Sequence, residues 1–68
     1  MIKLKRFNNT DFILNAELIQ TVEETPDTMI TLINGQKILV LENSDEVVNR
    51  IIEYKRKIFT NYAQSALS

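Results

Sequence analysis

The dipeptide Asn34-Gly35 constrains the fold most, because it separates two apolar runs rich in β-branched residues. Asn-Gly between two such runs is the strongest short-range signal for a β-hairpin. A two-residue type I′ turn at this position would place Thr31 opposite Ile38. The sequence therefore predicts an antiparallel hairpin over residues 28–41.

This register sorts the side chains of the hairpin onto two faces, and both faces are apolar. One face would carry Ile30, Leu32, Leu39 and Leu41, and the other would carry Met29, Ile33, Ile38 and Val40. An antiparallel sheet with one solvated face alternates apolar and polar residues instead. We therefore expect a helix to cover one face, and either other strands or a second chain to cover the other. The candidate self-association residues are Met29, Ile33, Ile38 and Val40, and we expect a homo-oligomer.

The N-terminal third of the chain shows a second hairpin pattern. Residues 2–7 alternate apolar and basic side chains, and an apolar run resumes at 12–14. Asn8-Asn9 is expected to make the turn between them, because Asn tolerates left-handed backbone conformations. Residues 15–19 then favour a short helical turn or a bulge, with an Asn as its N-cap.

A third strand is expected at about residues 20–25. Pro26-Asp27 follows it and fits a type I turn, which favours Pro at its second position and a side-chain-capping Asp. The chain would then reverse into the strand that begins near Thr28.

The apolar spacing changes from strand-like to helical after residue 43. Asn43-Ser44-Asp45-Glu46 is a helix start in which either Asn43 or Ser44 could be the cap. We predict a helix over about 44–62, with fraying beyond it. Its apolar residues are Val47, Val48, Ile51, Ile52, Ile58, Phe59 and Tyr62. Those expected to pack against the sheet are Val48, Ile51, Ile52 and Phe59.

Together these patterns predict an α+β fold: a small antiparallel sheet of about five short strands over residues 2–41, followed by one C-terminal amphipathic helix. With 68 residues, the chain is long enough for one small domain, residues 1–68, and too short for two. No segment approaches the 18–20 apolar residues of a membrane-spanning helix. We therefore expect a cytoplasmic protein.

Composition argues against most enzyme chemistry. The chain has no Cys and no His, so it lacks thiolate nucleophiles, cysteine-bound metal sites and the commonest general base. Glu23, Glu24 and Asp27 could suggest a carboxylate site, but adjacent strand residues point to opposite faces. We therefore expect no catalytic, cofactor or metal site.

Several short segments, taken in order, resemble the FlbD/SwrD family of small bacterial flagellar proteins. They are residues 12–19 (FILNAELI), 24–28 (ETPDT) and 32–37 (LINGQK), and then Glu42 followed by Val47-Val48. The resemblance covers roughly residues 1–57. It implies a non-catalytic accessory protein that supports flagellar motor function and swarming by binding motor or assembly proteins. It also implies action from the cytoplasmic side, near the motor.

The residues also suggest one further surface and one alternative function. Lys55, Arg56 and Lys57 could contact an acidic partner or the membrane surface, or could simply be a solvated helix end favoured by the helix dipole. The alternative function is a small nucleic-acid-associated regulator whose sheet and helix resemble a LytTR-type domain. A net charge of −1 argues against nucleic-acid binding, which usually needs a basic surface.

Overall fold

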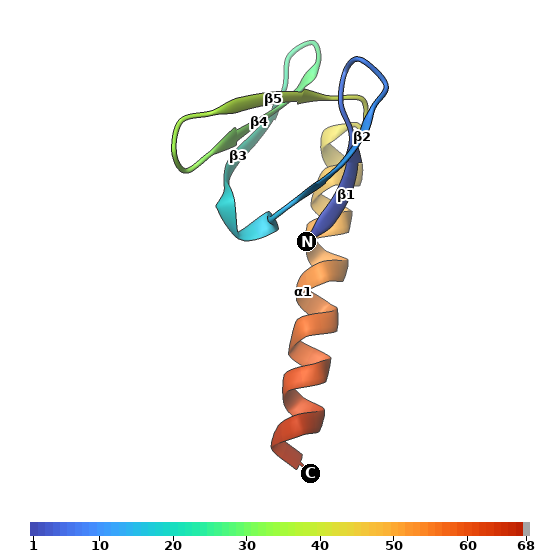
Figure 1. The fold of residues 1–68 in the computed structure, drawn as a ribbon, viewed down its shortest axis with the longest axis vertical. Helices are drawn as coiled ribbons and strands as arrows, with labels where there is room; N and C mark the ends of the chain where they lie inside the picture. Colours follow the sequence, from blue (N-terminus) through green and yellow to red (C-terminus); the bar gives the residue numbers. More distant parts are fainter. Residues whose placement is uncertain (68) are drawn as a thin grey trace.

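The computed structural model describes the backbone of residues 1–67 and the side chains of residues 1–59. Five strands precede one long helix, which confirms the predicted α+β fold (Figure 1). The elements are β1 (Ile2–Lys5), β2 (Asp11–Leu14), a 3-10 turn η1 (Ala16–Leu18), β3 (Ile19–Glu24), β4 (Thr28–Leu32), β5 (Lys37–Val40) and α1 (Ser44–Leu67). The helix thus extends beyond residue 62, where its end was expected.

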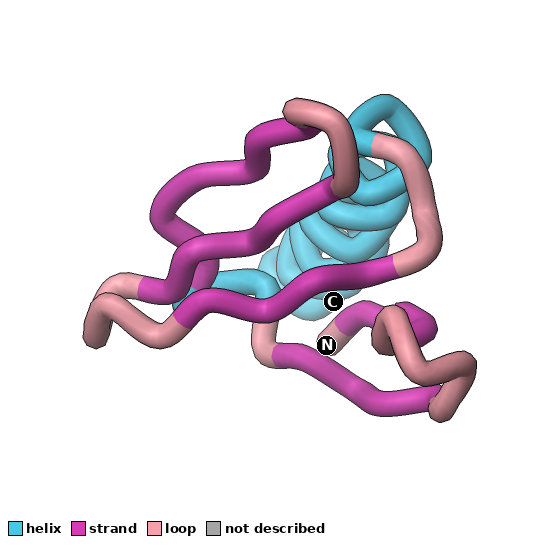
Figure 2. The backbone as a smooth tube through the Cα atoms, turned by 90° about the horizontal axis from the view of Figure 1, so that it is seen from above, coloured by secondary structure: helices cyan, strands magenta, loops and turns pink. Residues whose placement is uncertain are grey.

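The strands form two small antiparallel sheets, β1–β2 and β3–β4–β5, rather than the single sheet expected. One corner joins them, where Arg6 forms an isolated antiparallel bridge with Val40. On either side of this bridge the Phe7 N–H donates to the Leu39 carbonyl at 3.1 Å, and the Leu41 N–H donates to the Lys5 carbonyl at 2.9 Å. The end of β1 therefore continues the β3–β4–β5 sheet for a few residues before it turns away (Figure 2).

The hairpin at Asn34-Gly35 forms where it was predicted, but its register differs by one residue. Ile30 lies opposite Ile38, and Thr31 lies opposite Lys37. The Leu32 N–H donates to the Gln36 carbonyl at 2.8 Å, so the loop has three residues instead of two. In this type of loop a type I turn is followed by one left-handed residue, here Gly35 with φ +89°.

The hairpin between β1 and β2 uses the same turn. The Arg6 N–H donates to the Thr10 carbonyl at 2.8 Å, and Asn9 takes the left-handed position with φ +71°. In both loops an Asn stands directly before the left-handed residue, and its side chain accepts a hydrogen bond from the backbone N–H two residues later. Asn8 accepts from Thr10, and Asn34 accepts from Gln36. This local bond stabilises the three-residue loop and explains the register.

A shift of one residue exchanges the two faces of a strand. Ile38 and Val40 therefore point into the core, where they are 7 % and 1 % exposed. This corrects the candidate self-association set, since Met29 and Ile33 lie on the opposite face from Ile38 and Val40. Met29 is half-buried there and Ile33 is exposed.

Pro26 and Asp27 lie between β3 and β4. The Thr25–Pro26 peptide bond is cis, which belongs to type VI turns and not to the type I turn expected. Asn15 caps η1 by accepting a hydrogen bond from the Glu17 N–H, and the β3–β4 register shifts between Ile19 and Thr21. A helical turn and a bulge thus both occur here.

The core lies between the two sheets and is closed by the first turns of α1. Its buried apolar residues are Ile2, Leu4, Leu14, Ala16, Ile30, Leu32, Ile38, Val40 and Val47. Ile51 and Tyr54 pack against it and are partly exposed. Spacings of four and three residues from Val47 through Ile51 to Tyr54 place these three side chains on one helix face.

The prediction of which helix face packs on the sheet was therefore partly wrong. Val48 is 43 % exposed, Ile52 is 47 % exposed and Phe59 is 72 % exposed. The apolar residues of α1 come in adjacent pairs, and neighbours on a helix point about 100° apart, so spacing alone does not say which member of a pair is buried. Phe59 is also remote from the strands, because α1 projects well beyond them (Figure 1).

Candidate functional site

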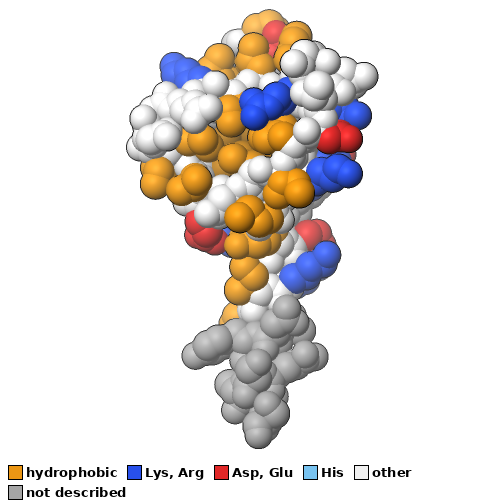
Figure 3. Space-filling view, viewed as in Figure 1, with side chains coloured by type: hydrophobic (Ala, Val, Ile, Leu, Met, Phe, Trp, Pro, Cys, Tyr) orange, Lys and Arg blue, Asp and Glu red, His pale blue; other side chains and the backbone are white. Residues whose placement is uncertain are grey.

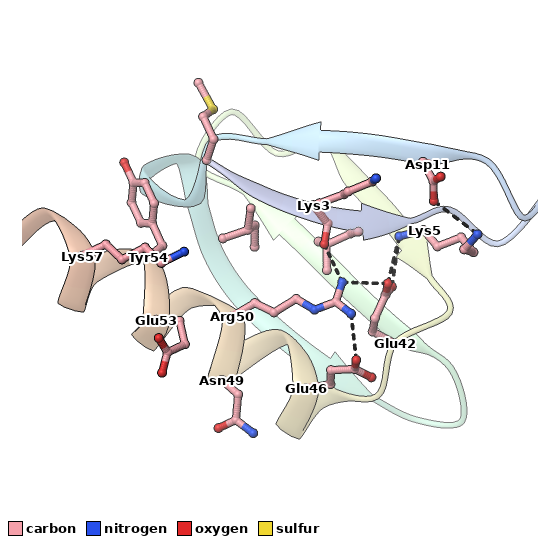
Figure 4. A pocket seen from close by; sticks show the side chains of 13 residues that line it. Lys3, Lys5, Asp11, Glu42, Glu46, Asn49, Arg50, Glu53, Tyr54 and Lys57 are labelled. Atoms are coloured by element: carbon pink, nitrogen blue, oxygen red, sulfur yellow. Dashed lines mark hydrogen bonds and ion pairs between the residues drawn. The ribbon is translucent and has the colours of Figure 1, made fainter.

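A hollow of about 630 Å³, the larger of two described here, lies between β1 and α1. It is lined by residues 1–5, by Asp11 and Glu42, and by the face of α1 that carries Glu46, Asn49, Arg50, Glu53, Tyr54 and Lys57 (Figure 4). The site therefore combines charged side chains of both signs with an apolar floor.

Arg50 lies at the centre of this hollow and binds three groups (Figure 4). Its Nη1 donates to the Lys3 carbonyl and to Glu42 Oε2, the latter at 3.0 Å. Its Nη2 donates to Glu46 Oε1 at 2.7 Å, one helical turn earlier. Arg50 thus ties α1 to β1 and to the segment that precedes the helix.

Glu42 completes this connection from the other side. Both of its carboxylate oxygens accept the Lys5 backbone N–H at 3.1 Å, and its side chain is only 10 % exposed. We call Glu42, Glu46 and Arg50 the clamp. Its charged groups are bonded to one another and to the backbone of β1, so they do not converge on an open position where a substrate atom could sit.

The sequence analysis missed most of this clamp. Glu46 and Arg50 have the four-residue spacing of a helical ion pair, which was a visible signal. No local spacing indicated the role of Glu42, because the backbone N–H that it binds belongs to Lys5, 37 residues earlier.

The structure separates the carboxylates considered as a cluster. Glu24 Oε1 accepts the Ser44 N–H at 2.7 Å, at the start of α1. Hydrogen bonds from the backbone and the side chain of Ser44 lower the pKa of this carboxyl, because they favour its charged form. Glu23 and Asp27 instead line a second hollow of about 220 Å³, beside Pro26, Met29 and Leu39. Among the side chains that the structure describes, residues 1–59, no group of three or more carboxylates is placed to hold a metal ion.

Asn43 is the cap of α1, since its Oδ1 accepts the Glu46 N–H at 2.8 Å. The Glu46 side chain pairs with Arg50, so it does not complete a reciprocal capping box. Together with Glu24, Asn43 satisfies two N–H groups that the first helical turn would otherwise leave unpaired.

Lys55, Arg56 and Lys57 do not form one patch, because consecutive helix residues diverge by about 100°. Lys57 lines the hollow between β1 and α1. Arg56 pairs with Glu53 at 3.3 Å on the helix surface. All three side chains are exposed, and Lys55 lies on the same side of the helix as Val48, Ile52 and Phe59.

Two exposed apolar surfaces stand out in the described part of the chain. The first, which we call the outer sheet face, comprises Phe7, Met29, Leu39 and Leu41. The second, which we call the helix stripe, comprises Val48, Ile52 and Phe59. On the face that Figure 3 presents, hydrophobic side chains lie over the strands and along the upper part of the helix; the members of the two surfaces are assigned from their exposed fractions. Apart from Met29, which is half-buried, the members of both surfaces are 38–72 % exposed.

Comparison with known families decides what kind of protein carries these surfaces. The family model FlbD, described as flagellar and swarming motility proteins, matches residues 1–59. The chain belongs to the FlbD family. The match spans every strand, the clamp and the helix stripe, and its description names motility rather than a catalysed reaction.

Two further comparisons add nothing to the FlbD assignment, since no curated protein and no solved structure gives a significant match. Within residues 1–67, no helix is both long enough and apolar enough to cross a membrane.

Proposed function

We propose that this FlbD protein is a non-catalytic flagellar accessory protein, which supports motor function and swarming by binding a flagellar motor or assembly protein. The family match to motility proteins carries this proposal. The geometry agrees with it, because Glu42, Glu46 and Arg50 of the larger hollow are bonded to one another and to the backbone of β1. The outer sheet face and the helix stripe are instead apolar and exposed. The protein would act on the cytoplasmic side, close to the motor and at most peripheral to the membrane.

The helix stripe is the surface that we assign to the flagellar partner. Val48, Ile52 and Phe59 line up along α1 at spacings of four and seven residues, which is the pattern of a helix that packs against another apolar element. Lys55 lies within the stripe and Arg56 beside it. A fitting partner therefore offers an apolar seam with acidic residues along its edge.

The size of the stripe suits a specific but modest contact. Burying one large apolar side chain contributes about 1.5–3 kcal/mol relative to leaving it exposed. Ile52 and Phe59 are 47 % and 72 % exposed, so each has only part of this energy left to contribute. Multiple copies of the partner in the motor would raise the effective affinity.

The test is complementation of swarming in cells that lack this gene. Ile52→Lys and Phe59→Lys should each abolish or strongly reduce swarming, while the thermal melt of the purified variant stays near that of the wild type. Ile13→Lys is the matched control, because Ile13 is 70 % exposed on β2, outside both apolar surfaces. We expect it to swarm normally.

Counting flagella and measuring swimming speed would show which step fails. Retained filaments with slow swimming indicate a motor defect, and missing filaments indicate an assembly defect. Normal swarming of both helix-stripe variants at normal protein levels would refute the assigned surface. Salt-sensitive binding of DNA by the purified protein would favour the nucleic-acid regulator instead.

A further inference from the structure

The outer sheet face is centred on Leu39 of β5, and its neighbours are set by the strand register. Met29 lies directly opposite Leu39 on β4. Phe7 adjoins it on the other side, donating its N–H to the Leu39 carbonyl. Leu41 follows two residues along the chain, on the same side of the strand. A continuous apolar row thus crosses from β4 through β5 to the end of β1.

The two ends of this row differ in shape and charge. At the β4 end, Met29 and Leu39 border the hollow of about 220 Å³, whose rim carries Glu23 and Asp27. At the β1 end, Phe7 is 50 % exposed, and Lys5 lies two residues before it, on the same side of the strand. One face therefore presents both a half-exposed aromatic ring with one basic neighbour and a hollow with an acidic rim.

We propose that the outer sheet face binds a second copy of this chain in a two-fold symmetric dimer. A two-fold axis parallel to β5 and passing by Leu39 lays the end of β1 over β4 of the other copy. The register then places Phe7 over the Met29 of the other copy, because both residues flank Leu39, on opposite sides.

The same operation matches the charges. Lys5 adjoins Leu41 across the corner between the sheets, and Asp27 directly precedes Thr28, which pairs with Val40. The axis therefore brings Lys5, which pairs with the exposed Asp11 of its own chain at 3.2 Å, near the Asp27 of the other copy, twice in the dimer. Opposite charges at both ends of an apolar row favour this arrangement over a shifted one.

The area that a dimer needs also favours a broad face over a single exposed side chain. A specific dimer usually removes about 800 Å² from each partner, which is roughly a sixth of the 4999 Å² exposed here. A face that spans β4, β5 and the end of β1 supplies a contiguous area, whereas Ile13 on β2 is a single exposed side chain. The dimer does not involve the helix stripe, so it goes beyond the proposed flagellar contact and leaves that surface open.

The first experiment measures mass by sedimentation equilibrium. The wild type should have twice the monomer mass of 7.9 kDa, and Leu39→Lys should return it to 7.9 kDa, because two lysines would face each other at the axis. Ile13→Lys should stay dimeric. Circular dichroism would verify that both variants are folded. A monomeric wild type at roughly 1 mM protein would overturn the proposal.

The second experiment tests the geometry by cross-linking, and the absence of native cysteine makes it specific. Packed sheets lie about 10 Å apart, beyond the reach of a disulfide, so a short bis-maleimide is the probe. Leu39→Cys should cross-link to itself. A mixture of Phe7→Cys and Met29→Cys chains should cross-link more than either variant alone, while Ile13→Cys should not. A dimer in which Leu39→Cys fails to cross-link would refute this face.

Discussion

Val47 and Val48 are adjacent valines with opposite surroundings, and they provide a sharp test of how α1 packs. Val47 is fully buried in the core, whereas Val48 is 43 % exposed. Val→Ala at position 47 removes about two buried methylene equivalents, a loss of about 1.6 kcal/mol in transfer free energy. The cavity left behind adds about 1 kcal/mol if its walls do not collapse. We expect Val47→Ala to lower the free energy of unfolding by about 2–3 kcal/mol.

The same change at Val48 is the matched control, because it removes the same atoms from a side chain that is largely in water. Its cost should stay below about 1 kcal/mol. Urea denaturation followed by circular dichroism measures both. A chain of 68 residues has a total stability of roughly 3–10 kcal/mol, so the difference between the variants should be large. If Val48→Ala costs as much as Val47→Ala, the assigned face of the helix is wrong.

Three other features lead to predictions of their own. Asn9→Gly should stabilise the fold by about 0.5–1 kcal/mol, because glycine adopts positive φ without strain. Gly35→Val should cost about 1–3 kcal/mol, because a β-branched residue is strained at positive φ. Thermal melts measure both changes. Arg50→Ala should lower the free energy of unfolding, measured by urea titration, by about 1–3 kcal/mol, because it leaves the shielded Glu42 without its ion-pair partner. Arg56→Ala is the control: it removes an exposed ion pair and should change the free energy of unfolding by less than about 0.5 kcal/mol. The pKa of Glu24 is lowered in the folded protein, so its contribution is present above the unfolded pKa and is lost as the pH falls through the folded pKa. Glu24→Gln should therefore reduce the acid-side loss of stability in melts recorded from neutral to acidic pH.

The hairpin loops show how far local sequence reaches. Asn34-Gly35 located the reversal between β4 and β5, because few residue pairs accept that backbone. It did not decide between a two-residue and a three-residue loop, since both place Gly in a left-handed conformation. The side-chain bond from Asn34 to the Gln36 N–H accompanies the longer loop, and with it Ile38 and Val40 turn into the core.

The clamp and the docking surfaces depended on contacts between distant parts of the chain. The spacing of Glu46 and Arg50 is local, but the role of Glu42 requires Lys5 to lie beside it. Likewise, the outer sheet face exists only because the end of β1 meets β5 at the bridge between Arg6 and Val40.

The sequence by itself determined the order of elements, the positions of the turns and the start of the helix. These features depend on backbone preferences, side-chain caps and hydrophobic spacing, all of which act over a few residues. Only the tertiary structure decided which member of each apolar pair on α1 is buried and which face of β5 is exposed. Both choices depend on where other strands lie, because a side chain is buried only when another layer packs over it. Before the layers pack, two adjacent apolar residues are equally able to become the buried one.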